Sequence, residues 1–254
     1  MGGSFLGASR MKILVIPDVH TEWEKAEAIA TAHPEHRLVF IGDYFDNFND
    51  TPEQNAKTAQ WLKESLRKPN RIHLKGNHDD VYDPRYNNWC SGFTPDKKIA
   101  INSVLTVEDW DMLPYFHEEN GWWFSHAGVT AYWFGKPFKE LTTALVEETL
   151  KEAVMYRLTG LRKLSSRESN CIWSADYERG GGSPVGGILW CDWSNLEVLP
   201  GINQVVGHTP RRNIEVKGEG EFRNINVDCS RDVRYHELLE IEENGEVNIF
   251  KNFI

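Results

Sequence analysis

The sequence predicts an α/β protein that contains two β-sheets. In the first part of the chain, short apolar runs alternate with helix start signals, which is the pattern of a parallel sheet with right-handed crossovers. In the second half, short apolar runs recur, and hairpin signals at Asn120-Gly121 and Asn244-Gly245 predict a mostly antiparallel second sheet. With 254 residues and 40% hydrophobic content, the chain has enough material to bury a core.

Three buried strands and two helices are expected in the first part of the chain. The strands are the runs at Lys12–Ile16, Arg37–Ile41 and Arg71–Lys75. Thr21 and Glu24 have the spacing of a capping box, which predicts a helix through about Ala32. The second helix is expected to begin at Thr51-Pro52, because proline is favoured at the first helical position, and to end at Pro69.

Each of these strands is followed at once by polar residues. They are Asp18-Val19-His20, Gly42-Asp43-Tyr44-Phe45-Asp46 and Gly76-Asn77-His78-Asp79. Ligands of parallel sheets bind beyond the carboxyl ends of the strands, so these three turns can converge. Two carboxylates as close as Asp43 and Asp46 raise each other's pKa unless cations or hydrogen bonds keep them ionised. We therefore expect Asp43 to bridge two metal ions at this edge of the sheet.

The rest of the chain is expected to add helices, strands and two notable segments. Helices are expected at Asp96–Leu105, Val107–Leu113 and Pro137–Leu158, and strands at Tyr115–Glu118, Trp122–Ser125, Ile188–Trp190, Gln204–Val206, Phe222–Val227, Tyr235–Ile241 and Val247–Phe250. The aromatic segment Tyr82–Ser91 is expected to cover the site, and the glycine-rich segment Ser165–Pro184 is long enough to indicate a binding loop. Two strands lead to a histidine, at Ser125-His126 and Gly207-His208.

The charge and the cysteines narrow the possible partners and the compartment. A formal net charge of -10 disfavours non-specific binding to nucleic acid or to an anionic membrane. A nucleotide or a phosphoprotein stays compatible with this charge, because bound metal ions would reverse the sign locally. No apolar run approaches the ~20 residues of a membrane span. The four cysteines form no C-x-x-C pair, which predicts free thiols and a cytoplasmic location.

One domain is expected over residues 11–254. Residues 1–10 are small and polar and lack an apolar signal core, while Met11-Lys12 has the form of a natural start. We therefore expect residues 1–10 to be a disordered leader or an alternative start.

Five polar motifs together indicate a family. D-x-H, G-D-x-x-D, G-N-H-D, Ser-His-Ala-Gly and Gly-His-Thr-Pro occur in this order, and each follows an expected strand. In this pattern the chain resembles the calcineurin-like metallophosphoesterases from residue 12 to about residue 230. It is most similar to their phosphoprotein-phosphatase and diadenosine-tetraphosphatase branch, through Leu189-Trp190-Cys191-Asp192 and Gly207-His208-Thr209-Pro210. The resemblance implies a four-layer α/β/β/α sandwich of two mixed β-sheets flanked by helices.

The resemblance also implies a dinuclear metal site. The first ion would bind Asp18, His20 and Asp43, and the second would bind Asp43, Asn77, His126 and His208. Such mixed carboxylate, imidazole and amide ligands suit two divalent transition-metal ions, with Mn favoured over Fe, Zn, Co or Ni. A water between ions roughly 3.5–4 Å apart becomes hydroxide near neutral pH and can attack phosphorus. His78 would protonate the leaving oxygen with Asp46 as its partner. Asp79 is expected to cap a helix or to support a metal ligand, without a role in the chemistry.

One motif departs from the branch that it resembles. Asp46 is followed by Asn47-Phe48, where that branch carries an arginine that grips the substrate phosphate as a bidentate fork. Asn47 is a candidate substrate contact, and one of four arginines could replace the missing clamp: Arg85, Arg157, Arg179 or Arg211. Pro210 stands in the last motif where a second histidine could follow, so the first ion would have fewer ligands from the protein.

The expected function is hydrolysis of phosphomonoesters, on a phosphorylated small molecule, nucleotide or phosphoprotein. Phosphodiesterase or (di)nucleotide polyphosphate hydrolase activity is the nearest alternative. A stacking wall for a nucleobase could come from Trp89, Trp122, Trp123, Trp190 or Trp193, although core packing explains most of them better. A non-catalytic scaffold with the same fold is a further alternative, but a scaffold should have lost ligands, and every expected ligand is present.

Overall fold

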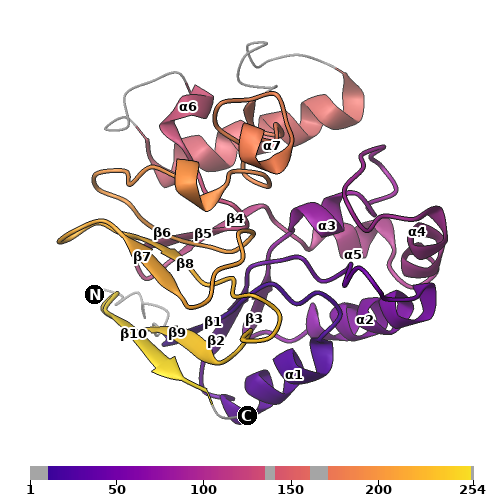
Figure 1. Ribbon diagram of the computed structural model, residues 1–254, viewed down its shortest axis with the longest axis horizontal. Coiled ribbons are helices and arrows are strands. Elements are labelled where there is room, and N and C mark those ends of the chain that lie inside the picture. Colours follow the sequence, from indigo (N-terminus) through magenta and orange to yellow (C-terminus); the bar gives the residue numbers. More distant parts are fainter. Residues whose placement is uncertain (1–10, 135–140, 161–170, 253–254) are drawn as a thin grey trace, which may run out of the picture.

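The computed structural model describes residues 11–134, 141–160 and 171–252 (Figure 1). Three sequence-based expectations fall wholly or partly outside these residues. They are the leader at residues 1–10, the start of the helix expected at Pro137–Leu158, and the first part of the loop expected at Ser165–Pro184.

The first sheet has the strand order β10-β9-β1-β2-β3. Its strands are β1 (Ile13–Ile16), β2 (Arg37–Phe40), β3 (Arg71–His73), β9 (Glu237–Ile241) and β10 (Val247–Lys251). β2 pairs in parallel with β1 on one side and with β3 on the other, as the alternation of strands and helices predicts. The crossover helices are α1 (Trp23–Ala32) and α2 (Pro52–Ser65). The carboxyl ends of β1, β2 and β3 therefore lie at one edge of the sheet.

The second sheet has the order β4-β5-β6-β8-β7. Its strands are β4 (Phe116–Glu119), β5 (Trp122–Ser125), β6 (Asn203–Val206), β7 (Glu215–Lys217) and β8 (Asn224–Asn226). β6 pairs in parallel with both β5 and β8, so the expectation of a mostly antiparallel second sheet is wrong. The long connection between β5 and β6 can return the chain in either direction, and the apolar pattern of a short strand does not encode that direction.

Two late segments also differ from expectation. The last hairpin joins the first sheet, because β9 pairs antiparallel with β1 and places Leu239 beside Val15. Both side chains are fully buried between the sheets. The segment expected as a strand at Ile188–Trp190 is a buried turn, in which the Trp190 N–H donates to the Gly187 carbonyl at 3.0 Å.

The two sheets pack face to face, and helices cover their outer faces (Figure 1). Val15 of β1 packs in the core between the sheets, whereas its neighbour Leu14 packs in a cluster with residues of α1 and α2. On the second sheet, Trp123 of β5 shares a cluster with Val146 on the outer helical layer. The predicted four-layer α/β/β/α sandwich is confirmed. Because both faces of β1 are buried, its sequence is a continuous apolar run.

The remaining helices are α3 (Asn77–Asp80), α4 (Pro95–Asn102), α5 (Val107–Asp111), α6 (Ala131–Phe134) and α7 (Thr143–Thr159), with 3₁₀ turns η2 (Tyr177–Arg179) and η3 (Trp193–Asn195). The expected start of α2 is confirmed, because Thr51 and Gln54 form a capping box there. The capping box expected at Thr21 is wrong, since α1 begins at Trp23 without a side-chain cap. The Thr21 N–H instead donates to the Tyr44 carbonyl at 2.8 Å, so a tertiary contact overrides the local signal.

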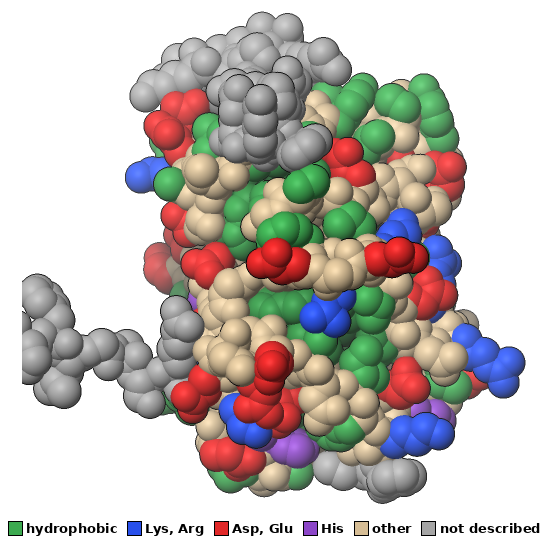
Figure 2. Space-filling view, turned by 90° about the vertical axis from the view of Figure 1, so that its left-hand side faces the viewer, with side chains coloured by type: hydrophobic (Ala, Val, Ile, Leu, Met, Phe, Trp, Pro, Cys, Tyr) green, Lys and Arg blue, Asp and Glu red, His purple; other side chains and the backbone are tan. Residues whose placement is uncertain are grey.

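The surface and the cysteines agree with the composition. Acidic side chains are spread over the face in Figure 2 instead of gathering in a single patch. Within the described part of the chain, no helix combines the length and the apolarity that crossing a membrane requires. All four cysteines are buried thiols outside any disulfide, as their spacing predicts, and the cytoplasmic location stays a prediction.

An ion-pair network fastens α1 and α2 to β3. Glu27 of α1 accepts hydrogen bonds from Arg71 of β3 at 2.9 Å and from Trp61 of α2 at 2.8 Å. Burial raises the pKa of Glu27, but Arg71, Lys68 and Trp61 together outweigh it and hold the pKa at about 2. The network therefore secures the helices that precede the second and third strands.

Replacing Glu27 by glutamine should lower the free energy of unfolding by about 1 kcal/mol at neutral pH. The pKa of Glu27 lies below its ordinary value of 4.5, so the stabilisation is present above that pH and is lost as the pH falls toward about 2. Urea unfolding of both proteins across this range measures the difference. An equal loss at neutral and at strongly acidic pH would contradict the ionic origin.

Candidate metal centre

Hydrogen bonds to the backbone bring the predicted motifs together at the carboxyl edge of the first sheet. The Asp43 carbonyl accepts from the His20 N–H at 2.7 Å, which joins the D-x-H turn to the turn after β2. The Asp43 carboxylate accepts from the His78 N–H at 2.8 Å. The His208 N–H donates to the Asp18 carboxylate at 3.1 Å and connects a loop of the second sheet. The motifs therefore converge as expected, from both sheets.

Close backbone contacts explain two of the motif glycines. Gly42 has a φ of 111°, and a Cβ there would lie 2.6 Å from the Gly76 nitrogen. A Cβ on Gly76 would lie 2.1 Å from Oδ1 of Asp43. The turns after β2 and β3 can approach this closely only because both residues lack a side chain.

Several site residues adopt left-handed backbone conformations. The φ values are 43° for His20, 48° for Asp43, 65° for Asp46 and 68° for His208. Residues other than glycine rarely adopt such values, and they keep them where surrounding contacts impose the conformation. Among the described residues, four of the eight non-glycine residues of this kind are predicted site residues. Backbone strain is therefore concentrated at this edge.

The first set of potential ligands contains Asp18, His20 and Asp43, with one ligand atom of each within 4.8 Å of the others. Nδ1 of His20 lies 2.8 Å from the Asp46 carbonyl, and because a carbonyl only accepts, Nδ1 carries the proton. Nε2 is then a lone-pair nitrogen, and it faces Oδ2 of Asp43 at 3.8 Å. Oδ1 of Asp18 is buried without a hydrogen-bond partner.

The second set contains Asp43, Asn77, His126 and His208. Nδ1 of His126 donates to the Ile41 carbonyl at 3.1 Å, so Nε2 is the nitrogen that holds the lone pair whenever the ring is neutral. That nitrogen lies 2.8 Å from Oδ1 of Asn77 and 3.4 Å from Oδ2 of Asp43. Nδ1 of His208 lies 2.8 Å from the same Asn77 oxygen. Burial lowers the pKa of His126, but Asp43 and Asp18 outweigh it and raise the pKa to about 9 in the metal-free chain, so Nε2 would exchange its proton for a bound ion.

These contacts fit divalent cations. Lone-pair nitrogens and carboxylate or amide oxygens point into the same buried space, where a positive ion would satisfy them together. The ring N–H groups of His20 and His126 donate to backbone carbonyls, which fixes the tautomer as is usual for metal-ligating histidines. Mixed oxygen and nitrogen donors suit transition-metal ions, and Asp43 belongs to both sets. The residues present can therefore hold two ions.

Burial and neighbouring charges set the protonation of the two aspartates. Burial raises the pKa of Asp18 to about 6, although the charge of His126 opposes this shift. Burial also raises the pKa of Asp43, but His126 and His78 outweigh it and hold the pKa well below its ordinary value. Asp43 is therefore ionised at neutral pH, which is the state that a shared metal ligand needs.

His78 lies beside these groups and pairs with Asp46, as expected. Its Nδ1 is 3.0 Å from Oδ2 of Asp46, and its side chain is 10% exposed. Burial lowers the pKa of His78, but Asp43 and Asp46 outweigh it and hold the pKa well above its ordinary value. The imidazole therefore carries a proton at neutral pH, and Nε2 is free to donate it.

Two residues that the sequence motifs did not single out hold Asp46 in place. The Tyr82 hydroxyl donates to Oδ1 of Asp46 at 2.6 Å, and the Lys97 ammonium donates to the same oxygen at 2.9 Å. Lys97 also donates to Asp50 at 2.6 Å. Lys97 lies on α4, 51 residues from Asp46, so no local pattern could reveal this contact.

Asp228 is a further carboxylate that the motifs missed. Both of its oxygens are buried without a hydrogen-bond partner. Burial and the charge of Asp18 raise its pKa well above the ordinary value. The position of Asp228 in the chain could have revealed it, because Asp228 follows β8, and β8 runs parallel to β6, the strand that leads to His208.

Asp79 and Asn47 stand next to site residues. Asp79 accepts from the N–H groups of Gly76 and Tyr44, each at 2.8 Å, so it caps α3 as expected. Asn47 is partly buried in the loop directly after Asp46. Its neighbour Phe48 is 68% exposed, with its ring centroid 6.3 Å from that of His78.

Two of the four candidate arginines lie away from the cavity at the site. Asn77 helps to line a cavity of about 500 Å³, to which neither Arg85 nor Arg211 contributes. Arg85 pairs with Asp83 at 2.7 Å on the wall of a different cavity. Arg211 lies 3.4 Å from Glu215.

The other two candidate arginines line the 500 Å³ cavity. Arg157 is occupied by a bidentate pair with Asp80, at 2.8 and 3.1 Å. Arg179 contacts Asp192 at 2.9 Å and the hydroxyl of Thr209. Nε of Arg179 is buried without a hydrogen-bond partner, so this side chain keeps an unused donor.

Three tryptophans also line this cavity: Trp89, Trp173 and Trp190. Trp89 is 71% exposed, whereas Trp122, Trp123 and Trp193 are buried, as core packing predicts. Trp173 was not among the tryptophans considered from the sequence. The cavity therefore combines aromatic surface with arginine donors.

Comparison with known proteins agrees with these findings. A profile of the family described as calcineurin-like phosphoesterase matches residues 11–212. One similar solved structure, provisionally named as a diadenosine tetraphosphatase, is 16% identical and covers 98% of this chain and 96% of its own, with a TM-score of 0.50. A protein serine/threonine phosphatase from Saccharomyces cerevisiae with similarity to human phosphatase PP5 is 12% identical and covers 98% and 82%, with a TM-score of 0.54. At these identities the likeness shows the fold. No curated protein sequence matches the chain.

Proposed function

The chain belongs to the calcineurin-like phosphoesterase family, and from this premise we propose that it is a dinuclear metal-dependent phosphoesterase that hydrolyses phosphomonoesters. The observation that supports this most is the convergence of two buried ligand sets on Asp43, next to the pair of His78 and Asp46. The first ion would bind Asp18, His20 and Asp43, and the second would bind Asp43, Asn77, His126 and His208. Mn²⁺ is the favoured ion because the donor set mixes oxygen with nitrogen.

Two bound ions would supply an activated water near neutral pH and neutralise charge that develops on the phosphoryl group. Asp43 would keep their separation constant, because the His78 N–H holds one of its oxygens at 2.8 Å. His126 would offer Nε2 as a ligand, because its other nitrogen is occupied by the Ile41 carbonyl. The near-complete burial of these side chains excludes bulk water from around them.

His78 would protonate the leaving oxygen. Asp46 holds Nδ1, so Nε2 is the nitrogen that donates. As the bond between phosphorus and the leaving oxygen breaks, that oxygen gains negative charge, and the proton neutralises it. Tyr82 and Lys97 would keep Asp46 oriented for this task.

We expect Arg179 to replace the missing phosphate clamp. Arg179 lies in the cavity wall with an unpartnered Nε, and a turn of its guanidinium away from Asp192 would bring its donors to a phosphate oxygen. Arg179→Ala should raise the KM for p-nitrophenyl phosphate by about 10- to 100-fold, the range for a lost hydrogen bond to a charged group, with a smaller change in kcat. Steady-state kinetics measures both values.

Arg85→Ala is the matched control for this prediction. Arg85 is also paired with a carboxylate, but it lines a different cavity, so its loss should leave KM unchanged. An unchanged KM in Arg179→Ala, or a larger increase in Arg157→Ala, would show that Arg179 is not the clamp.

Hydrolysis of a dinucleoside polyphosphate is a second candidate function. The cavity beside Asn77 is lined by three tryptophans, and indole rings can stack on nucleobases. A substrate with two bases would use this surface, whereas a small phosphomonoester would not need it.

A phosphatase assay on metal-stripped protein reloaded with Mn²⁺ tests the proposal. Faster turnover of p-nitrophenyl phosphate than of bis(p-nitrophenyl) phosphate and diadenosine tetraphosphate supports a phosphomonoesterase. Faster turnover of the dinucleotide would favour the second candidate. No turnover with any divalent transition metal would favour a non-catalytic scaffold.

A further inference from the structure

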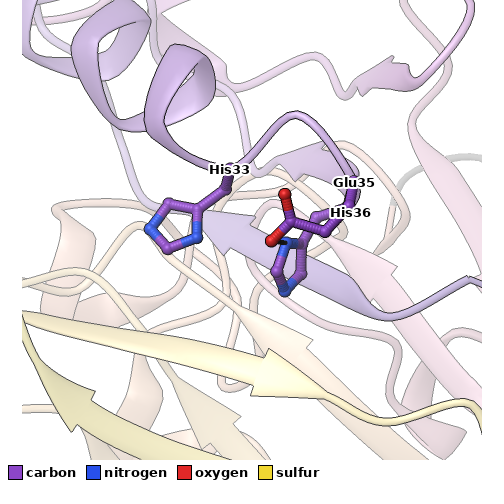
Figure 3. Close-up of side chains that lie close together, drawn as sticks. All are labelled: His33, Glu35 and His36. Carbon is purple, nitrogen blue, oxygen red and sulfur yellow. Dashed lines mark ion pairs between the residues drawn. The ribbon is translucent and has the colours of Figure 1, made fainter.

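A further group of side chains that could hold a metal ion lies at the other end of β2 from the candidate centre. His33, Glu35 and His36 occupy the turn between the end of α1 and the start of β2 (Figure 3). One ligand atom of each lies within 4.8 Å of the others. The His36 N–H donates to the His33 carbonyl at 3.2 Å, and this tight turn brings the two ring centroids to 5.2 Å.

His36 presents a lone-pair nitrogen to this group. Its Nε2 lies 2.7 Å from Oε2 of Glu240 on β9, and because an ionised carboxylate only accepts, Nε2 carries the proton. In the neutral ring, Nδ1 then holds a free lone pair. Nδ1 is buried and lies 3.1 Å from Oε1 of Glu35, but the two atoms are not aligned for a hydrogen bond. A cation bound to both atoms would satisfy this contact.

The surroundings supply negative charge and access from solvent. The Lys12 ammonium contacts Glu240 at 3.8 Å and Glu242 at 2.8 Å. These two carboxylates and Glu35 carry more negative charge than the single ammonium neutralises. A cavity of about 510 Å³ is lined by His33, Glu35 and Glu240, among others. The Glu35 side chain is 66% exposed, so an ion can reach the group without any rearrangement of the core.

We propose that His33, Glu35 and His36 form a separate site for one divalent transition-metal ion of the zinc class. Tetrahedral zinc with bonds of about 2.0–2.1 Å places neighbouring ligand atoms about 3.3 Å apart. The 3.1 Å between Nδ1 of His36 and Oε1 of Glu35 is already close to that spacing. His33 is partly exposed, so its ring can turn to supply the third ligand, and water takes the fourth position. Glu240 fixes the tautomer of His36, as carboxylates do behind metal-bound histidines.

An ion at this site joins three elements of the fold. His33 ends α1, His36 precedes β2, and Glu240 extends the connection to β9. Binding to the folded chain alone stabilises it by mass action. The site lies before β2 and the candidate centre lies after it, so the ion takes no part in hydrolysis. The proposal therefore does not depend on the proposed function.

Zinc titration of the metal-stripped chain tests this site. Wild type should bind about three Zn²⁺ per chain after desalting, measured by elemental mass spectrometry, with two in the candidate centre and one here. His33→Ala and Glu35→Gln should each bind about one fewer, with the affinity of that ion lowered at least ~10- to 100-fold. Glu35 is exposed, so its variant keeps the fold even if the other does not.

His117→Ala is the matched control. His117 is a partly buried histidine that pairs with Glu119 at 3.0 Å. It belongs to none of the groups in the described chain that could hold a metal ion, so the variant should keep all three ions. Asp43→Asn weakens the candidate centre, and the Co²⁺ content of this variant should fall by about one more ion when His33→Ala is added, with loss of the visible absorption of a tetrahedral site. Equal metal content in wild type, His33→Ala and Glu35→Gln, or equal Co²⁺ content in Asp43→Asn with and without His33→Ala, overturns the proposal.

Discussion

Replacing Asp43 by asparagine should lower kcat for p-nitrophenyl phosphate by about 1,000-fold or more. Asp43 belongs to both ligand sets, whereas every other predicted ligand belongs to one. The substitution keeps the shape of the side chain and removes the charge that would lie between two cations. Metal bound at the candidate centre should fall from about two ions per chain to less than one. Kinetic assays and elemental analysis of the same preparations measure both effects.

The same substitution should also destabilise the metal-free protein, although neighbouring carboxylates reduce the effect. Burial raises the pKa of Asp79 to about 7, and the charge of Asp43 adds to this shift. Burial and the charge of Asp43 also both raise the pKa of Asp18. Removal of this charge relieves repulsion at Asp79 and Asp18. However, the low pKa of Asp43 shows that its attraction to His126 and His78 is larger, so the melting temperature of the metal-free variant should fall below that of wild type.

Asp111→Asn is the control for this experiment. Asp111 is an exposed carboxylate that pairs with Arg85, so its loss should leave both activity and metal content unchanged. Normal kcat together with two bound ions in Asp43→Asn would show that Asp43 is not the shared ligand. An unchanged melting temperature of the metal-free variant would show that His126 and His78 do not stabilise the charge of Asp43.

His78→Gln should lower kcat for alkyl phosphates such as glycerol phosphate by about 100- to 10,000-fold, the range for loss of a general acid. The loss for p-nitrophenyl phosphate should be below about tenfold, because nitrophenolate is stable enough to leave without a proton. Metal bound by the two sets that share Asp43 should not change, since His78 belongs to neither and instead lies in a separate group with Asp46 and Cys90. Steady-state kinetics on both substrates measures the loss of kcat for the alkyl phosphate relative to the loss for p-nitrophenyl phosphate.

Asp46→Asn provides an independent check on the same role. An amide at this position cannot hold the proton of Nδ1 on His78 as a carboxylate does, so it should reproduce the selective loss on alkyl phosphates. Equal losses on both substrates in His78→Gln would exclude leaving-group protonation. A loss of metal in either variant would instead indicate that the pair supports the ligands.

The parts of the fold that the sequence predicted correctly are those where local pattern and tertiary structure agree. β1 is buried on both faces, so its apolar run leaves few alternatives. Thr51 and Gln54 cap α2 with their own side chains, which is a purely local event. The capping box predicted at Thr21 does not form, because the Thr21 N–H donates to the distant Tyr44 carbonyl, an interaction that no local spacing encodes. The place of β9 in the first sheet was missed for the same reason.

The sequence by itself determined the family, and it predicted the residues that would hold metal, because each of these residues follows a strand directly and parallel strands bring such positions to one edge. Only the tertiary structure decided what surrounds them. Tyr82, Lys97 and Asp228 reach the site across long separations in the chain. The structure alone also separated Arg179, with its unused donor in the cavity wall, from three arginines of the same type. A motif fixes which groups are present, but burial, partners and direction depend on how distant segments pack.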